Sequence, residues 1–451
     1  MFLESKNESD LTPLVSFLAI NAANASSAAA KREGYGGDFG GSASVIEVPG
    51  SYTPNSSWTD ARPTPELHPK LVKFDPSVDL IRRKENLVRR IGMVGDDGVC
   101  RRFVLQCSLS YWTRVEERQS QTSFVIDKIL RKGVKTSRAH ISIKPQPVVP
   151  VAQRLRLVYE PDHWTSLERE REVAAARSQS RIDFVDRFNK ELQEALSSKS
   201  YDEVEDVERS KDERENRLRI FRSLLNDSDL SPSMLKNQIS VFLNSTELIH
   251  HFRRTFAKQL AADCLLQYAF GIAERNPEHV VILRSSGAVL PNEAKILYNS
   301  QGYIEREKNH VPFRFTRNLS SLIGFPLVEG QFMQAMVLFA EAVDAEKDFL
   351  NPIFQLLMRD DLLAFFTKTV AKSDSSTVAL EKQLQDRVVK NTSTVQSRFS
   401  LCAPSLPAQN KESSPKEEGK QALDHKVRQL VAAAQDDENL SMMPSTFQAW
   451  L

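Results

Sequence analysis

Residues 271–279 read Gly-Ile-Ala-Glu-Arg-Asn-Pro-Glu-His. Ahead of them, apolar side chains recur every four residues from Leu248 to Tyr268, which is the period of one buried face of an α-helix. Behind them, the apolar run 280–283 has the length of a short buried strand. We therefore predict a long helix that leads into a loop and then into a strand. The loop carries carboxylate, guanidinium, amide and imidazole groups, so it is the first candidate for chemistry.

The region before this helix has the pattern of a β-rich lobe. Residues 87–94 and 102–107 flank the tetrapeptide Gly95-Asp96-Asp97-Gly98, and an Asp-Gly turn between two such runs predicts a β-hairpin. The same lobe is predicted to hold a helix over 115–130 and strands over 141–151 and 155–159, which are broken by prolines. After the loop, the chain reads as a helical second lobe.

Segments of biased composition divide the chain further. Residues 1–65 are a predicted disordered tail, because Ser, Ala, Gly and Asn dominate them, and residues 66–371 form the main domain. Within that domain, residues from about 165 to 224 are dense in alternating charge and predict a helical insertion. Its helices have two open interpretations, a solvated face or a regulatory docking surface. Residues 372–419 predict a flexible linker, and 420–451 a final helical segment.

The last residues of the chain include Phe447 and Trp450. Ordering a chain end requires apolar burial to offset the entropy that the end loses. We therefore predict that this terminus docks back onto the body of the protein.

Composition narrows the class of protein. The 60 Lys and Arg residues balance 59 Asp and Glu, so the net charge of +1 predicts neither nucleic-acid binding nor membrane adsorption. The four cysteines are far apart and lack zinc or redox spacing, which favours a reducing compartment. Residues 14–30 are apolar but follow acidic residues, the wrong sign for a targeting leader, and no run reaches the length of a membrane span. An intracellular, soluble protein is expected.

Three further motifs, taken in chain order with the loop, resemble the phosphatidylinositol 3-kinase-related kinases and their C-terminal FATC segment. Residues 311–318, Val-Pro-Phe-Arg-Phe-Thr-Arg-Asn, resemble the signature that follows the activation loop in these enzymes. Residues 116–118, Glu-Glu-Arg, resemble the start of their αC-like helix, and residues 439–451 resemble the FATC end. The family signature falls on Glu117, Arg118, Pro312, Phe313, Arg314, Thr316, Asn318, Phe447, Trp450 and Leu451.

The resemblance implies an α+β, bilobal kinase fold like that of the phosphatidylinositol 3- and 4-kinases, with a β-rich N-lobe, a helical C-lobe and a FATC helix over 420–451. It also allows a check of the chemistry. Phosphoryl transfer needs a lysine on the phosphates, a carboxylate at the attacking hydroxyl, and an Asn and an Asp on the metal ions.

Each of these catalytic positions is altered. The lysine position falls on Gln106, and the catalytic-loop aspartate position on Glu274, which keeps a carboxylate on a longer arm. Asn276 stands where the family has a histidine, and His279 replaces the metal-binding Asn. Imidazole is a poorer magnesium ligand than oxygen donors are. The aspartate of the Asp-Phe-Gly position falls on Glu293. The resemblance therefore implies a pseudokinase without catalytic residues, cofactor or metal.

Within the family, the sequence is most similar to transcription cofactors of the TRRAP type, whose kinase-like domain is also degenerate. This resemblance implies a nuclear scaffold whose partners are protein subunits of SAGA-type histone acetyltransferase complexes that regulate transcription at chromatin. No direct contact with nucleic acid or membrane is predicted. Such cofactors carry long helical repeats ahead of this region, so three interpretations stay open: a fragment, a truncated gene model, or the separate C-terminal part of a split scaffold.

Two alternatives come from other classes of function. The first is an active, divergent protein or lipid kinase, in which Glu274 and Glu293 substitute for aspartates. The second is a membrane-surface anchor formed by the terminal helix with Phe447 and Trp450.

Overall fold

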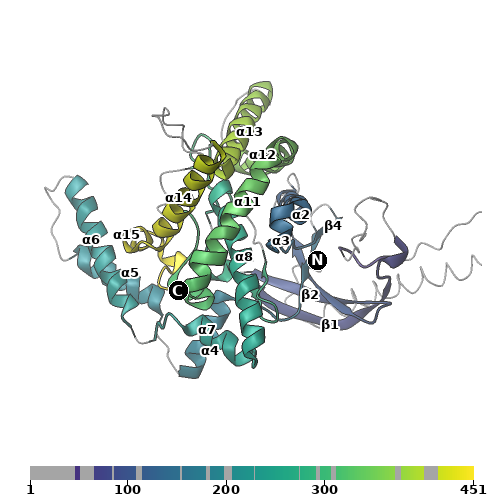
Figure 1. Ribbon diagram of the computed structural model, residues 1–451, viewed down its shortest axis with the longest axis horizontal. Helices are drawn as coiled ribbons and strands as arrows, with labels where there is room; N and C mark the ends of the chain where they lie inside the picture. Colours follow the sequence, from purple (N-terminus) through teal and green to yellow (C-terminus); the bar gives the residue numbers. More distant parts are fainter. Residues whose placement is uncertain are drawn as a thin grey trace, which may run out of the picture. The chain divides into compact units, whose positions relative to one another are not determined.

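The computed structural model describes residues 46–50, 65–83, 86–107, 114–152, 155–178, 183–197, 206–227, 229–273, 275–290, 295–305, 311–370, 377–400 and 415–451. The chain divides into two compact units. The first, here the sheet unit, comprises residues 1–111 and 146–162. The second, here the helical unit, comprises residues 112–145 and 163–451. Figure 1 shows the sheet in purple and blue, α2 and α3 also in blue, and the later helices from teal to yellow.

The sheet unit holds one five-stranded antiparallel sheet in the order β1-β2-β3-β5-β4. The strands are β1 (Leu71–Arg83), β2 (Asn86–Gly95), β3 (Cys100–Cys107), β4 (Val148–Ala152) and β5 (Leu155–Glu160). The predicted hairpin is confirmed, because β2 and β3 pair antiparallel on either side of the Gly95–Gly98 turn. Gly98 has a φ of 74°, a conformation that glycine adopts without the penalty of a Cβ. One face of the sheet buries Ile91, Met93, Phe103 and Leu157.

Two predictions about the first part of the chain need correction. Residues 141–147 were predicted as part of a strand, but the strand β4 begins only at Val148. Prolines at 145 and 147 supply no backbone N–H to a ladder, which is consistent with that late start. Residues 46–50 were assigned to the disordered tail, but Val48 is buried and its N–H donates to the Pro69 carbonyl at 2.9 Å. Residues 1–45 and 51–64 of that predicted tail lie outside the described residues.

The helical unit contains most of the chain. Its helices are α2 (Val115–Lys132), α3 (Val134–Arg138), α4 (Leu167–Ser178), α5 (Phe184–Ser197), α6 (Asp206–Leu225), α7 (Met234–Phe242), α8 (Thr246–Phe270), α9 (Arg317–Ile323), α10 (Phe325–Leu327), α11 (Met333–Ala345), α12 (Lys347–Val370), α13 (Thr377–Ser400), α14 (Pro415–Gln435) and α15 (Asp437–Ser441). Short turns are η3 (Pro277–His279), the π-turn η4 (Val328–Phe332) and η5 (Ser445–Phe447). A small antiparallel sheet joins β6 (Trp164–Ser166), β7 (Val281–Leu283) and β8 (Val289–Leu290). The predicted helix over 115–130 is confirmed as α2, but its contacts place it in this unit and not with the β-rich lobe.

Helix α8 is the central element of the helical unit, and it contacts α11 and α13. The predicted stripe is largely confirmed, because Phe252, Phe256, Leu260 and Cys264 are each at most 1% exposed. At the two ends of the stripe, Tyr268 is half-buried and Leu248 is 50% exposed; Leu248 lies in the first turn, which the core does not reach. None of the described helices is by itself long and apolar enough to cross a membrane; α9 with α10 and α11 passes that test only as a pair bent by 89°.

The charged insertion is helical as predicted, but it is not simply a solvated face. Its polar helices α5 and α6 pack on each other and carry apolar stripes: Phe184, Phe188, Leu192, Ile220, Phe221 and Leu224 are all buried. Glu170 of α4 is fully buried, where it accepts hydrogen bonds from the Arg284 guanidinium and from Thr165 Oγ1 at 2.7 Å. Because charged residues dominate these helices, the apolar stripes were not recognised from the sequence.

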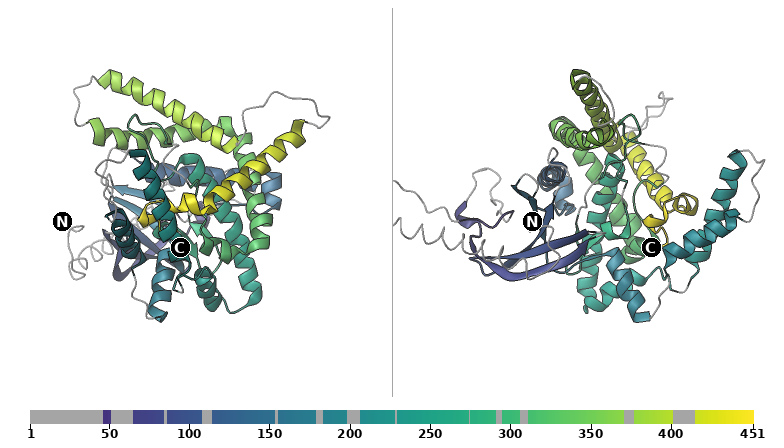
Figure 2. Two further views of the ribbon diagram at one scale, coloured as in Figure 1. Left: turned by 90° about the vertical axis from the view of Figure 1, so that its left-hand side faces the viewer. Right: turned by 180° about the vertical axis from the view of Figure 1, so that it is seen from behind.

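Helix α13 replaces about half of the predicted flexible linker at 372–419. Its buried residues include Val395 and Phe399, and it lies alongside α12 (Figure 2). Asn391 is also buried, and its side-chain amide donates to the Gly302 carbonyl at 2.9 Å. The polar composition of this segment predicted flexibility. In the folded state, however, hydrogen bonds satisfy the buried amide of Asn391, so the segment can be ordered. Residues 401–414 lie outside the described part of the chain.

Candidate functional site

The loop that follows α8 begins at a position where only glycine fits. Gly271 adopts φ 64° and ψ 47°, and an added Cβ would lie 2.8 Å from Ile304 Cγ2. The N–H of Ile272 donates back to the Gln267 carbonyl at 3.0 Å. Arg398 Nη1 of α13 donates to the Tyr268 carbonyl at 3.0 Å, so a cation neutralises the negative end of the helix. The chain therefore leaves α8 in one defined direction.

Residues 275–279 continue the loop along the core. Arg275 is 3% exposed, and its Nη1 donates to the Val311 carbonyl at 2.8 Å. Asn276 precedes the turn η3, and its side chain makes no capping hydrogen bond. Pro277 and His279 belong to η3. Two predicted site residues, Glu274 and Glu293, lie outside the described residues.

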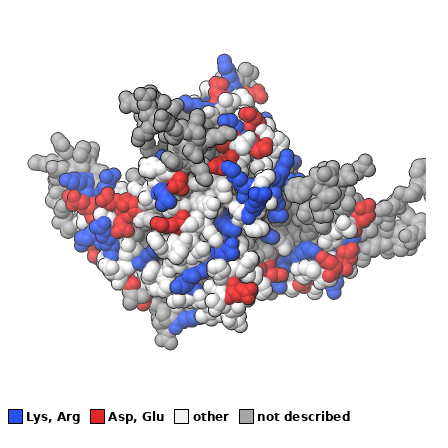
Figure 3. Space-filling model, viewed as in Figure 1, with Lys and Arg blue, Asp and Glu red and all other residues white. Residues whose placement is uncertain are grey.

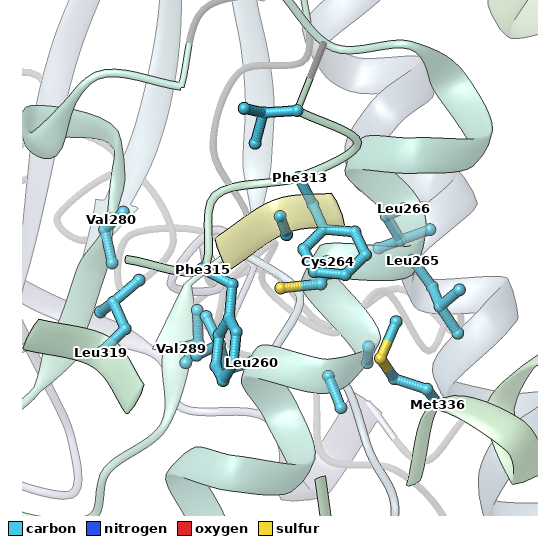
Figure 4. Packing of buried hydrophobic residues seen from close by; sticks show 14 of the residues in the cluster. Leu260, Cys264, Leu265, Leu266, Val280, Val289, Phe313, Phe315, Leu319 and Met336 are labelled. Atoms are coloured by element: carbon cyan, nitrogen blue, oxygen red, sulfur yellow. The ribbon is translucent and has the colours of Figure 1, made fainter. Parts of the chain in front are cut away.

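The segment 311–318 lies against this loop and against α8. Phe313 and Phe315 are fully buried, and Figure 4 shows both rings beside Cys264 of α8. The Phe315 ring stacks on Phe332 with centroids 4.5 Å apart. Because the two phenylalanines alternate with Arg314, the guanidinium points away from them toward the loop and the chain terminus. The predicted signature residues of 311–318 thus share one segment, in which Phe313, Arg314, Thr316 and Asn318 are buried and Pro312 is half-buried.

Arg314 is the point at which loop and C-terminus meet. Its Nη1 donates to the carbonyl of Arg275 at 3.0 Å and also to the carbonyl of Phe447. Its Nη2 donates to the Gln448 carbonyl at 3.2 Å. The guanidinium carbon lies 4.6 Å from the centre of the Phe447 ring, within cation–π distance. One side chain therefore holds three backbone carbonyls and one ring.

The two residues that follow extend the contact to the end of the chain. Thr316 Oγ1 donates to the Leu451 carbonyl at 2.7 Å. Arg317 Nε donates to the Trp450 carbonyl at 3.1 Å, and its Nη1 donates to the Leu225 carbonyl at 2.8 Å. The side chain of Arg317 thus links the terminus to the charged insertion. We call Arg275, Arg314 and Arg317 the arginine clamp.

Burial of the charged guanidinium groups of the clamp is electrostatically unfavourable. Burial, followed by repulsion from Arg275, lowers the pKa of Arg314 to about 9. Burial likewise lowers the pKa of Arg275 to about 10. Removing a guanidinium from water is unfavourable unless hydrogen bonds replace the hydration. For Arg314, the carbonyls of Arg275, Phe447 and Gln448 supply those bonds, so the burial of its guanidinium depends on the C-terminal segment.

The terminus also packs through its apolar side chains. Phe447, Trp450 and Leu451 are each 2% exposed, which confirms the prediction that the terminus docks back. The Trp450 ring lies 5.5 Å from that of Phe188 on α5. Figure 2 shows the terminal segment in yellow beside the helices of the insertion. The structure therefore brings the predicted residues Arg314, Thr316, Phe447, Trp450 and Leu451 into one site.

The other predicted residues lie elsewhere. Glu117 and Arg118 are on α2, and Arg118 Nε donates to Asp360 of α12 at 3.3 Å. Gln106 is on β3 in the sheet unit, directly opposite Arg156 of β5. Cross-strand partners leave the same face of a sheet, so a guanidinium adjoins the position where the resemblance places a lysine. Only the β3–β5 register reveals Arg156, and for that reason the sequence analysis missed it.

Asp263 is a second residue that the sequence analysis missed. It lies on α8, where Gln267 Nε2 donates to its carboxylate at 2.7 Å, and it lines a small hollow with Ile143, Gln259, Leu266 and Val289. Burial raises the pKa of Asp263 to about 6. Such shifts are frequent at functional sites but also occur in structural networks. In the described part of the chain, no three His, Cys, Asp or Glu residues are placed to hold a metal ion.

The raised pKa of Asp263 has a testable effect on stability. The Asp263 carboxyl keeps its proton in the native state up to a pH of about 6, whereas an aspartate in the unfolded chain loses it near its ordinary pKa of 3.8. Unfolding therefore becomes easier as pH rises through that window. Because Asn stays neutral, Asp263→Asn is expected to raise the free energy of unfolding by about 2 kcal/mol at neutral pH and to leave it unchanged near pH 4. Urea unfolding at both pH values measures this. Asp386→Asn, on an exposed face of α13, is the control, and an equal gain for Asp263→Asn at both pH values would contradict the account.

A family model described as phosphatidylinositol 3- and 4-kinase matches residues 107–367, more than half of the 451 residues. The chain belongs to the phosphatidylinositol 3- and 4-kinase family. The match begins at the end of β3 and extends into α12, so it includes the loop and the arginine clamp. The expected fold class is confirmed by this match and by a solved relative. The FAT and kinase domain of CtTel1 superposes with a TM-score of 0.62 over 90% of this chain and 25% of that chain, at 16% identity.

Within the phosphatidylinositol 3- and 4-kinase family, the chain is similar to transcription-associated proteins, as its motifs predicted. It is 28% identical over 326 residues, 70% of this chain, to the SAGA complex/NuA4 acetyltransferase complex subunit Tra1 of Schizosaccharomyces pombe. It is 24% identical over 430 residues, 92% of this chain, to the human transformation/transcription domain-associated protein. It spans only 9% and 10% of the lengths of these two relatives.

Proposed function

We propose that this chain is a non-catalytic, kinase-like module of a TRRAP-like transcription cofactor. In this proposal it acts as a protein-interaction subunit of SAGA-type histone acetyltransferase complexes in the nucleus. Its partners are other protein subunits, and it takes no cofactor. The relatives named as acetyltransferase-complex and transcription-associated proteins support the cofactor role.

The observation that carries the proposal is the state of the kinase positions. By the resemblance, Gln106 of β3 falls where phosphoryl transfer uses a lysine, and His279 of η3 falls where it uses an Asn for magnesium. The loop that contains His279 is anchored instead, because Arg314 donates hydrogen bonds both to the Arg275 carbonyl of that loop and to the Phe447 carbonyl of the C-terminus. Residues held in this way suit a fixed surface for protein contacts.

The alternative of a membrane-surface anchor is disfavoured by burial. Such an anchor inserts its aromatic side chains into the lipid interface. Phe447 and Trp450 are each 2% exposed, and the carbonyls of both residues accept hydrogen bonds from the arginine clamp. Their exposure would require the clamp to open.

A nucleotide titration separates the proposal from the alternative of an active kinase. A ligand that binds only the native state raises the melting temperature, by an amount that grows with its concentration. We expect no shift for the full chain with ATP up to about millimolar concentration, with or without magnesium or manganese, since a Kd above that range leaves the folding equilibrium unchanged. A metal-dependent shift, abolished in Glu274→Ala, would contradict the proposal.

The scaffold role has its own test. The full chain carrying an affinity tag should co-purify acetyltransferase-complex subunits from nuclear extract, identified by mass spectrometry. The Trp450→Ala variant should lose them if the docked terminus organises the binding surface. Recovery of no such subunit by the wild-type chain would overturn the scaffold role whatever the nucleotide titration gives.

A further inference from the structure

Two stretches of the helical unit are basic without any acidic residue. Residues 128–140, Lys-Ile-Leu-Arg-Lys-Gly-Val-Lys-Thr-Ser-Arg-Ala-His, carry five Lys or Arg. Residues 250–258, His-His-Phe-Arg-Arg-Thr-Phe-Ala-Lys, carry three. The whole chain has a net charge of only +1, so these runs are a local excess of positive charge. The first covers the end of α2 and all of α3, and the second lies in the first half of α8.

The fold brings the two runs together although they are far apart in the sequence. Lys258 Nζ of α8 donates to the Ala139 carbonyl, just after α3, at 2.6 Å. The next residue, Gln259, donates from Nε2 to Ser142 Oγ at 3.3 Å. Arg254 lies one helical turn before Lys258 on the same face of α8. The end of α3 and the middle of α8 therefore form one surface, which we call the basic surface.

Few of the charges on the basic surface are neutralised. Two ion pairs occur among the described residues, Arg131 with Asp127 at 2.6 Å and Lys135 with Glu341 at 2.8 Å. Lys132, Arg138 and Arg254 are exposed and have no ion pair within the described ranges. Burial first, and then repulsion from Arg254, lowers the pKa of Lys258. Like charges held this close favour an anion that would screen them.

Exposed apolar side chains lie on α2 and α3, the helices that carry the first basic run. Val134 of α3 is 66% exposed and Phe124 of α2 is 40% exposed. Figure 3 shows Lys and Arg side chains gathered over the region of α2 and α3, with uncharged surface beside them. The phosphate backbone of a nucleic acid has no apolar group that could pack against an exposed valine or phenylalanine. A peptide can supply both carboxylates for the cations and apolar side chains for these residues.

We propose that the basic surface binds an acidic peptide segment of a partner protein, with apolar residues interspersed among its carboxylates. Lys132, Arg138 and Arg254 pair with the carboxylates, and Val134 contacts an apolar side chain of the peptide. The inference rests on the proposed role as a protein-interaction module, and it names the chemistry of one partner.

The test is fluorescence anisotropy with the full chain and a fluorescein-labelled synthetic peptide that repeats Asp-Glu-Phe-Asp-Glu-Leu. The triple variant Lys132→Glu, Arg138→Glu, Arg254→Glu should bind this peptide about tenfold more weakly, since exposed charge pairs contribute up to about 1 kcal/mol each. The matched control reverses Lys211, Arg214 and Arg219, three exposed cations of α6, and should bind as the wild type does. Circular dichroism and melting temperatures establish that both variants are folded.

Two further arms use only the wild-type chain, so they do not depend on the variants. A peptide with Asn and Gln in place of Asp and Glu should not bind, and binding of the acidic peptide should weaken as salt rises. Equal binding of both peptides, equal loss in both triple variants, or tighter binding of a DNA duplex than of the peptide would each overturn the inference. If the peptide does not bind while acetyltransferase subunits still co-purify, this inference is wrong and the scaffold role stands. If the peptide binds but no acetyltransferase subunit co-purifies, the scaffold role is wrong and this inference stands.

Discussion

Trp450→Ala is expected to lower the free energy of unfolding of the helical unit by about 3–5 kcal/mol, the usual range for loss of a buried large aromatic side chain. Trp450 is 2% exposed, and its ring packs 5.5 Å from that of Phe188. Its removal leaves a cavity between the terminus and α5 of the charged insertion. Urea unfolding followed by circular dichroism measures the loss, and amide hydrogen exchange should show faster exchange in α5 as well as at the terminus.

The matched control for this variant is Phe325→Ala. Phe325 is 73% exposed, so the change should stay within about 0.5 kcal/mol. If Trp450→Ala were as mild as this control, the terminus would not be part of the core in solution. An effect on the terminus alone, with α5 unchanged, would contradict the contact with Phe188.

Arg314→Met is expected to destabilise the helical unit by about 3 kcal/mol. The methionine fills most of the volume of the arginine but leaves the carbonyls of Arg275, Phe447 and Gln448 without their donor. Each buried carbonyl left unpaired costs about 1–3 kcal/mol, and the relief of a buried cation offsets part of that sum. Arg314→Lys should be intermediate, because an ammonium group cannot reach three carbonyls with the geometry of a guanidinium.

Urea unfolding and hydrogen exchange of residues 445–451 report on the clamp. The control is Arg219→Met on α6, an exposed arginine whose described side-chain contact is a 3.4 Å bond to Asn216. A stabilising Arg314→Met would show that the buried charge outweighs its hydrogen bonds. In that case the clamp would be retained for specificity of the fold and not for its stability.

The sequence predicted well where one local rule determines a structure. The Asp-Gly turn at Asp97-Gly98 and the four-residue period of α8 were sufficient for the hairpin and the central helix. Prediction failed where tertiary contacts overrode composition. In α13, Asn391 satisfies its amide on backbone groups of residues 302–304, and no local pattern can reveal such a partner. The same limit applies to Glu170, whose partner Arg284 is 114 residues away.

The sequence by itself determined the family, through motifs that retain their order. It also indicated that the terminus docks, because ordering a chain end that carries Phe447 and Trp450 requires apolar burial. Only the tertiary structure determined which residues bind that terminus. Arg314 and Arg317 reach its carbonyls because α8, the loop and segment 311–318 converge on one place. The hydrogen bond from Lys258 to the Ala139 carbonyl likewise depends on the tertiary structure that places residue 139 beside α8. Local periodicity specifies the face that an element buries, whereas the partner that covers this face is set by long-range packing.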